Sequence, residues 1–237
     1  MGTYLICATR GERGWNGPEE QDPGLEALGL IREKELRCAA ENLGLREVIL
    51  LHYIDGDLDQ ADPQEIIPNI VTHIRRIRPQ VVVTFAYEGN YGHPDHIALA
   101  QFTAAALVCA ADANYLPASR QSPHRVSKFY HMVDSKTSVD LIRDLIGEIN
   151  MSVDGVERNQ IGWDDWAITS RIDASAYFDL VWKAVMCHKS QLPGYGPMVE
   201  LPREALIKIF GEGNFIRVFS LVNAGRRQET DLFEGLR

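Results

Sequence analysis

Residues 81–96 read VVVTFAYEGNYGHPDH and contain the two signals on which the expected fold depends. The apolar run over residues 81–85 is typical of a strand that is buried on both faces of a parallel sheet. Pro94 suits the first position of a helix, because the N–H that proline lacks would have no partner there. The segment therefore predicts a strand, a glycine-containing loop and a helix that has His93 as its N-cap.

The same alternation of strand and helix patterns extends over most of the chain. Helical spacing of apolar residues or β-rich apolar runs identify each expected element. Alternation of this kind predicts an α/β fold, a Rossmann-like three-layer sandwich with a mostly parallel sheet, built as a single domain over residues 1–237. The expected strands are 3–8, 48–51, 80–85, 128–133, 168–172 and 215–222, and the expected helices are 25–43, 63–77, 93–113, 138–149, 174–188 and 202–210, followed by a polar tail.

Composition and charge exclude several classes of protein. The 237 residues carry 24 basic and 33 acidic side chains, a net charge of -9 that disfavours binding to nucleic acid or to anionic lipid. The longest apolar segment, residues 97–111, is short for a bilayer span, and the N-terminus lacks a basic stretch followed by an apolar run. We therefore expect a cytoplasmic protein with a small-molecule partner and no membrane partner.

The four cysteines predict no cross-link. They are Cys7, Cys38, Cys109 and Cys187, all widely spaced and without a Cys-x-x-Cys pair. Neither a disulfide framework nor a zinc ribbon is indicated by such spacing. We expect reduced thiols.

The histidines of the opening segment point to chemistry. His93 and His96 are three residues apart, so that both can face one small volume from the start of a helix. In parallel α/β sheets, ligands bind at this place, where the carboxyl end of a strand leads into a helix. Two histidines with Asp95 between them indicate part of a metal-centred hydrolytic site. The alternative is that His93 merely caps the helix.

The segment at residues 91–96 resembles the second signature of the LmbE-like, or PIG-L-like, zinc-dependent N-acetyl-sugar deacetylases. Other segments match the same family in the same order: residues 8–14 (ATRGERG), 31–36 (IREKEL), 55–56 (DG) and 183–191 (KAVMCHKSQ). The matches extend from residue 8 to residue 191, and their order makes coincidence an inadequate explanation.

The resemblance assigns roles around the proposed zinc ion. It implies that His96 is a zinc ligand and that His93 is a general acid that also stabilises the oxyanion of the tetrahedral intermediate. Asp95 would orient His93 and raise its basicity. Tyr91 would offer its hydroxyl group to the substrate carbonyl oxygen.

The resemblance also implies a sugar site. Glu12, Arg32 and Asp55 would bind sugar hydroxyls or position the acetamide, and His188 would border the pocket. Three of them also have a purely structural reading: Arg32 with Glu35 as an exposed ion pair, Asp55 as part of a turn, and His188 as a helix cap. Glu12, in a glycine loop, is ambiguous.

The implied reaction is removal of an N-acetyl group from an amino sugar or glycoside by zinc-bound water. A catalytic zinc ion normally takes three protein ligands. In the family, the other two ligands and the base come from a His-Pro-Asp-Asp motif at the end of the first strand, and this sequence contains no such motif. The resemblance therefore implies a fold whose first strand and helix are missing. Asp164 and Asp165 are no substitute, since no histidine lies near them in the sequence.

Two hypotheses follow from the missing motif. Either the motif is encoded upstream of Met1, or the chain is a catalytically inactive family member that acts as a sugar-binding or assembly protein. A sheet that lacks an inner strand exposes edges that can pair, which would give the chain a reason to form a homo-oligomer.

Overall fold

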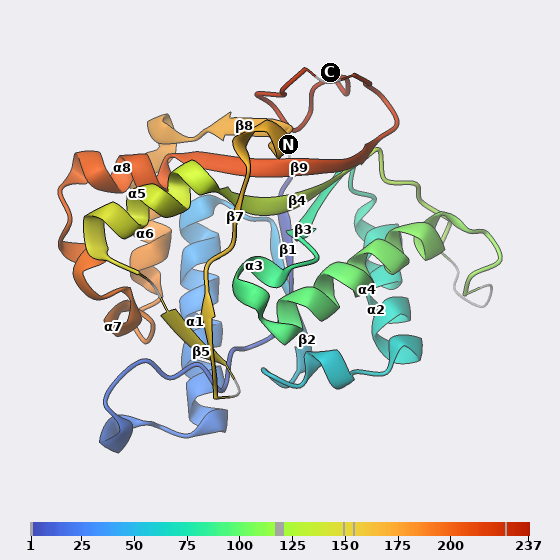
Figure 1. Ribbon diagram of the computed structural model, residues 1–237. Helices are drawn as coiled ribbons and strands as arrows, with labels where there is room; N and C mark the ends of the chain where they lie inside the picture. Colours follow the sequence, from blue (N-terminus) through green and yellow to red (C-terminus); the bar gives the residue numbers. More distant parts are fainter. Residues whose placement is uncertain (1, 117–120, 149, 154, 226) are drawn as a thin grey trace. The chain divides into compact units, whose positions relative to one another are not determined.

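A computed structural model describes the chain except for residues 1, 117–120, 149, 154 and 226 (Figure 1). The chain forms two compact units, and each unit is built from two segments of the sequence. The first unit comprises Met1–Leu58 and Asp173–Glu212, and the second comprises Asp59–Ile172 and Gly213–Arg237. Strands and helices alternate in both, so the predicted α/β class is confirmed. The single domain stays a prediction.

The first unit contains a two-stranded parallel sheet and a pair of packed helices. Strand β1 (Tyr4–Thr9) pairs with β2 (Glu47–Tyr53), and α1 (Leu25–Leu43) connects them. Helix α1 ends where the sequence predicts, because Gly44 adopts the left-handed conformation at φ 67° that a helix end requires. The remaining helical segments are η1 (Glu19–Gln21), η4 (Ser175–Tyr177), α6 (Phe178–Cys187), α7 (Leu192–Tyr195), η5 (Gly196–Glu200) and α8 (Arg203–Phe210).

A disulfide joins α1 to α6. It links Cys38 to Cys187, which are separated by 149 positions in the sequence. The expectation of four reduced thiols is therefore wrong for this pair. No local pattern in the sequence predicts this bond, because the packing of α1 against α6 brings the two residues together.

The second unit is built on a mixed sheet. Its strands lie in the order β3-β4-β9-β8, and β7 pairs with β4 off this path. Strand β4 is parallel to β3 and to β7 but antiparallel to β9, so the sheet is mixed, with an antiparallel pairing beside the expected parallel ones. The elements are η2 (Leu58–Gln60), α2 (Pro63–Ile77), β3 (Val81–Phe85), α3 (Gly89–Gly92), α4 (Pro94–Ala111), β4 (Lys128–Ser135), α5 (Lys136–Ile146), β5 (Asn150–Val153), β6 (Val156–Asn159), β7 (Gly162–Trp163), η3 (Asp165–Ala167), β8 (Ser170–Asp173) and β9 (Glu212–Ser220).

Strand β3 is less buried than its apolar sequence predicts. None of its residues is fully buried, and Val83 is 40% exposed. Among the described residues β3 pairs only with β4, so one of its edges has no strand beside it. The prediction of a strand covered on both faces is wrong for the described part of the chain.

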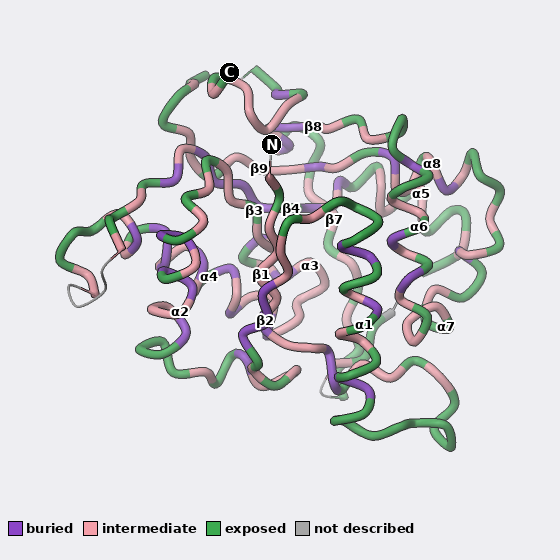
Figure 2. Tube along the Cα trace, turned by 180° about the vertical axis from the view of Figure 1, so that it is seen from behind, coloured by how far each residue is buried: buried purple, intermediate pink, exposed green. Residues whose placement is uncertain are grey.

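Helices α2 and α4 pack against each other, and Figure 2 shows buried segments along both. Asp62 caps α2 by accepting the backbone N–H of Gln64 at 2.8 Å, and Pro63 opens the helix as predicted. Helix α4 has the length and composition of a helix that could cross a membrane, but 44% of that stretch is buried. Together with its packing against α2, this is typical of a core helix.

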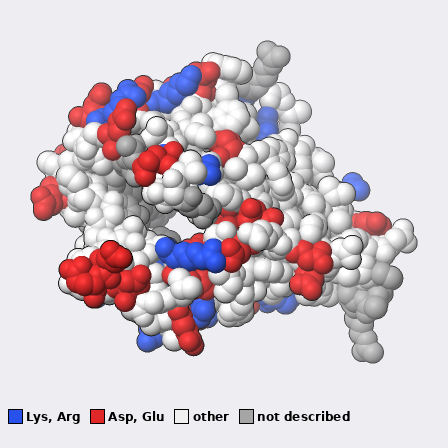
Figure 3. All heavy atoms as spheres, turned by 60° about the horizontal axis from the view of Figure 1, so that its bottom comes forward, with Lys and Arg blue, Asp and Glu red and all other residues white. Residues whose placement is uncertain are grey.

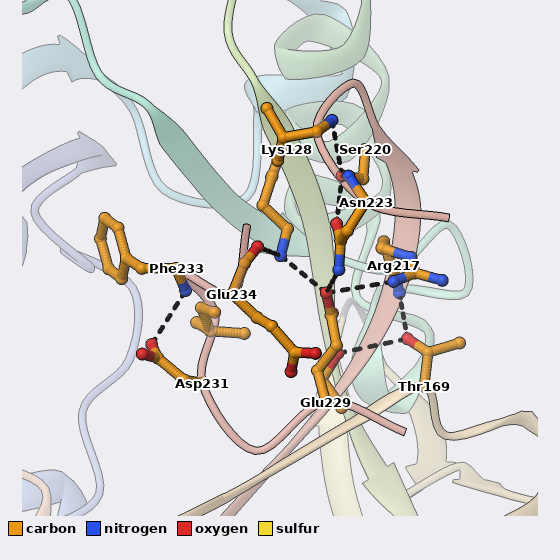
Figure 4. Close-up of polar contacts among 12 residues, drawn as sticks. Lys128, Thr169, Arg217, Ser220, Asn223, Glu229, Asp231, Phe233 and Glu234 are labelled. Carbon is orange, nitrogen blue, oxygen red and sulfur yellow. Dashed lines mark hydrogen bonds and ion pairs between the residues drawn. The ribbon is translucent and has the colours of Figure 1, made fainter. Parts of the chain in front are cut away.

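The expected polar tail is fastened to the sheet by Glu229 (Figure 4). This side chain is only 1% exposed, although a carboxylate is rarely buried without partners. Burial alone would raise the pKa of Glu229, but the hydrogen bonds that it accepts outweigh burial and lower the pKa to about 2. The donors are Lys128 Nζ at 2.6 Å, Tyr130 Oη at 2.8 Å, Ser170 Oγ at 2.8 Å, Asn223 Nδ2 at 2.6 Å and Arg217 Nη1 at 3.0 Å.

Candidate functional site

The His-Pro-Asp-His segment lies where the loop after β3 enters α4. His93 is the N-cap, and its Nδ1 accepts the backbone N–H of Asp95 at 3.1 Å. Pro94 occupies the first helical position, so both sequence predictions for this helix start are confirmed. With Nδ1 accepting a hydrogen bond, a neutral His93 ring carries its proton on Nε2.

Three predicted site residues form one cluster of rings. The rings of His93 and His96 stack with centroids 4.7 Å apart, as expected for side chains three residues apart on a helix. The ring of Tyr91 meets both edge-on, at 5.7 Å from His93 and 5.3 Å from His96. Phe85, at the end of β3, stacks on His96 at 3.8 Å. The cluster therefore places two imidazoles and a phenol beside each other.

His96 is arranged as a metal ligand would be. Its Nδ1 lies 3.2 Å from the carbonyl oxygen of Gly89, so a proton on Nδ1 can be donated there. This leaves the lone pair of Nε2 free, the arrangement in which histidine binds metals. Burial and the nearby His93 lower the pKa of His96 to about 4, although the bond to Gly89 acts in the opposite direction. His96 is therefore neutral at pH 7.

The titration of His96 follows from this arrangement. In an NMR titration of the ring C–H signals, we expect His96 to protonate with a midpoint near 4, well below the usual histidine pKa of 6.5. Since the unfolded chain takes up this proton first, His96 makes the folded state less stable as pH falls from 6.5 towards 4. Phe85→Leu removes the stacked ring and should move the midpoint upwards. A wild-type midpoint near 6.5 would contradict the burial of His96.

The described residues do not complete a zinc site. Among them, no three His, Cys, Asp or Glu side chains gather around one point as metal ligands must. His96 is one ligand, whereas a catalytic zinc ion normally takes three. Asp164 and Asp165 form ion pairs with Lys136 and Arg171 instead. We therefore derive no reaction step through zinc.

Asp95 is 5% exposed and lies in the first turn of α4. Its backbone N–H is the group that contacts the His93 ring. That its carboxylate orients His93 and raises its basicity stays a prediction.

Residues 158–163 hold the loop before His93, a support that the sequence did not reveal. They run alongside residues 88–92, with which they make a series of contacts in antiparallel order. This support matters because Asn90 adopts a left-handed conformation at φ 71°, which is uncommon outside glycine. The contacts are Trp163 Nε1 to Glu88 Oε1 at 2.7 Å, Ile161 N to Asn90 O at 3.0 Å and Arg158 Nη1 to Gly92 O at 2.7 Å.

Glu12, Asp55 and Arg32 meet at the loop after β1 in the first unit. Glu12 is 4% exposed, pairs with Arg10 Nε at 3.0 Å and accepts the backbone N–H of Asp55 at 3.4 Å. The carboxylate of Asp55 accepts the backbone N–H of Arg13 at 3.1 Å, and Arg13 lies in the same loop as Glu12. Arg32 Nη1 donates to the carbonyl oxygen of Gly11 at 2.7 Å. The structure thus brings together three residues that are far apart in the sequence.

The alternative role predicted for Arg32 is an ion pair with Glu35, but Glu35 binds Ser190. Both oxygens of Glu35 accept hydrogen bonds from Ser190, each at 2.7 Å. His188 takes the C-cap position of α6, and its pKa is lowered by burial first and then by Arg32, against an opposing effect of Glu35. The predicted residues thus form two groups, with Tyr91, His93, Asp95 and His96 in the second unit and Glu12, Arg32, Asp55 and His188 in the first.

Comparison with solved structures identifies the fold. The N,N'-diacetylchitobiose deacetylase from Pyrococcus horikoshii matches with a TM-score of 0.66 at 18% identity, over 92% of this chain and 73% of that chain. The 4-carboxy-2-hydroxymuconate hydratase GalB from Pseudomonas putida matches with a TM-score of 0.64 at 17% identity, over 94% of this chain and 87% of that chain. Because one neighbour is a deacetylase and the other a hydratase, the fold does not determine the reaction.

Comparison of sequences identifies the family. The family model described as "PIG-L: GlcNAc-PI de-N-acetylase" matches residues 2–107. A protein of Thermobispora bispora named 1D-myo-inositol 2-acetamido-2-deoxy-alpha-D-glucopyranoside deacetylase is 30% identical, over 98% of this chain and 88% of that protein. The matched region includes the loop after β1 as well as the His93–His96 segment. The chain therefore belongs to the PIG-L family of de-N-acetylases.

Proposed function

We propose that this protein hydrolyses the N-acetyl group of an amino sugar or a related glycoside. The observation that carries the proposal is the cluster of Tyr91, His93 and His96, in which Nε2 of His93 carries a proton. The Thermobispora bispora relative, whose name describes a 2-acetamido sugar as its substrate, supports the choice of bond.

In the proposed reaction, His93 acts on the nitrogen of the amide that is cleaved, and Tyr91 acts on its carbonyl oxygen. Water adds to the acetyl carbonyl carbon, the C–N bond breaks, and the leaving amine takes up a proton, without which it is a poor leaving group. His93 delivers this proton from Nε2 in its imidazolium form, and the water molecule that adds returns a proton to the ring. The Tyr91 hydroxyl donates a hydrogen bond to the carbonyl oxygen as negative charge develops on it. Asp95 positions His93 from the first turn of α4.

Glu12, Arg32, Asp55 and His188 are proposed to bind the sugar. Carboxylates accept hydrogen bonds from sugar hydroxyls, and guanidinium groups donate them. Glu12 is held by Arg10 and by the Asp55 amide, so its position is fixed before any ligand arrives. Arg32 and Asp55 are held by the same loop.

Zinc binding by this chain tests the assignment of His96. Since the described residues supply one evident ligand, we expect zinc to bind weakly and to be lost on dialysis. His96→Ala should abolish the residual binding, whereas His52→Ala, which changes an exposed histidine, should not. Metal analysis by mass spectrometry after dialysis measures both. Tightly held, near-stoichiometric zinc would mean that further ligands complete the site.

Release of free amine from a panel of N-acetyl sugars, with zinc supplied, tests the function. Slow release that is reduced about 10²-fold or more in His93→Gln supports the proposed deacetylation. Binding of a sugar without any release supports the second candidate, a catalytically inactive sugar-binding or assembly protein. That candidate is favoured by the incomplete set of metal ligands among the described residues.

A further inference from the structure

A groove of about 510 Å³ lies beside the His93 segment in the second unit. Gly92 and Pro94, the chain neighbours of His93, form part of its wall, so the groove borders the backbone on both sides of His93. Ile97 and Phe102 of α4 contribute apolar surface. Asp59, Gln101 and Arg158 add polar groups, so the groove has both the apolar surface and the polar groups of a small-molecule site.

Arg158, on strand β6, is the cation of this groove. Of its five N–H groups, only one on Nη1 has an acceptor among the described residues, the carbonyl oxygen of Gly92 at 2.7 Å. Its Nε is buried and makes no hydrogen bond within the described part of the chain. Arg158 is half-buried, and no ion pair links it to a described carboxylate. Its charge is therefore available to a ligand.

The positive charge of Arg158 contrasts with the acidic character of the chain. The chain has a net charge of -9, and acidic side chains form the larger patches on the face in Figure 3. Asp59 also borders the groove, but it is exposed, so water and salt screen its charge. An unpaired guanidinium beside a hydrolytic site is suited to a planar, two-oxygen contact with a phosphate or a carboxylate.

We propose that Arg158 is a specificity-determining residue that binds an oxyanion, a phosphate or a carboxylate, on the substrate beyond its N-acetyl group. The proposal rests on the proposed deacetylase function for the neighbouring His93. The bond of Nη1 to Gly92 fixes the guanidinium, and its remaining donors bind the anion. In the proposed arrangement, the substrate has its charged group at Arg158 and extends past Gly92 and Pro94, so that its acetamide reaches the Tyr91, His93 and His96 cluster.

Binding measured by calorimetry tests the proposal without requiring turnover. The probes are methyl N-acetylglucosaminide, N-acetylglucosamine 1-phosphate and N-acetylmuramic acid, which are neutral, phosphorylated and carboxylated respectively. We expect at least one anionic sugar to bind about tenfold or more tightly than the neutral one, since hydrogen bonds to charged groups are the strong ones. Which anion gains more identifies phosphate or carboxylate as the preferred group.

The variants separate this role from a structural one. Arg158→Gln should bring the affinity ratio of anionic to neutral sugar close to one, and Arg158→Lys should retain part of it. Arg125→Gln removes the same charge from an exposed position outside the groove and should leave the ratio unchanged. If Arg158 only supported the fold, Arg158→Gln would weaken the binding of all three sugars equally. Equal affinity of the wild type for the three sugars, or no binding of either anionic sugar, would overturn the role of Arg158, while amine release independently tests the deacetylase function.

Discussion

Replacing Glu229 with alanine is expected to lower the free energy of unfolding by about 3–5 kcal/mol, the cost of removing one partner from a buried ion pair. The substitution would leave Lys128, which is 0% exposed, with an uncompensated charge inside the protein. It would also remove the acceptor of Tyr130 and Ser170 and release the C-terminal segment from β4 and β8. Urea unfolding followed by tryptophan fluorescence measures the loss.

A matched control and a double variant test the cause. Glu234→Ala changes a carboxylate of the same segment that is less buried, and it should cost well under 1 kcal/mol. Lys128→Met combined with Glu229→Gln should lower the free energy of unfolding by less than the sum of the two single variants, because the double variant leaves neither buried charge without its partner. If Glu229→Ala were as mild as Glu234→Ala, the buried network would not stabilise the fold.

The same network makes stability depend on pH in the acid range. The pKa of Glu229 is about 2 in the folded state, against the usual 4.5, so the unfolded chain takes up the proton first. Its contribution is therefore complete above pH 4.5 and is lost as pH falls towards 2. Glu229→Gln should show a flatter acid unfolding profile than the wild type.

The elements that the sequence predicted well carry local signals. Residues 25–43 and 63–77 form helices with the predicted bounds, because Gly44 ends the first and Asp62 with Pro63 begins the second. The position of His93 was predictable for the same reason, since Pro94 fixes the helix start. Helical spacing then sufficed to bring His93 and His96 together.

The features that the sequence missed depend on distant partners. The β5–β6 hairpin is short and polar, and residues 150–166 carry no pattern that would predict its contact with residues 88–92. Glu229 looks like one more charge in a polar tail, and its partner Lys128 lies 101 positions away in the sequence. Strand β3 shows the opposite error, since its apolar sequence is typical of a strand covered on both faces, yet Val83 is 40% exposed.

Removal of the disulfide is the second change with a large expected effect. Replacing Cys38 and Cys187 together with serine should lower the free energy of unfolding by about 2–5 kcal/mol, since a cross-link over a long loop restricts the unfolded chain. The bond joins α1 to α6 next to His188, and the neighbouring Glu35 and Ser190 join the same two parts of the chain. Loss of the bond therefore also loosens the segment that carries His188. Guanidinium unfolding with and without reductant measures the effect.

The two remaining cysteines provide the control. Cys109 is a free, half-buried thiol, so Cys109→Ser should cost less than the disulfide and should leave the response to reductant intact. The double serine variant should be insensitive to reductant, because reductant acts on the wild type by opening the bond that this variant lacks. Thiol titration of the unfolded, unreduced wild type should find two free thiols, Cys7 and Cys109. Four titratable thiols would show that Cys38 and Cys187 are not joined, and the packing of α1 against α6 would then have to be stabilised without a cross-link.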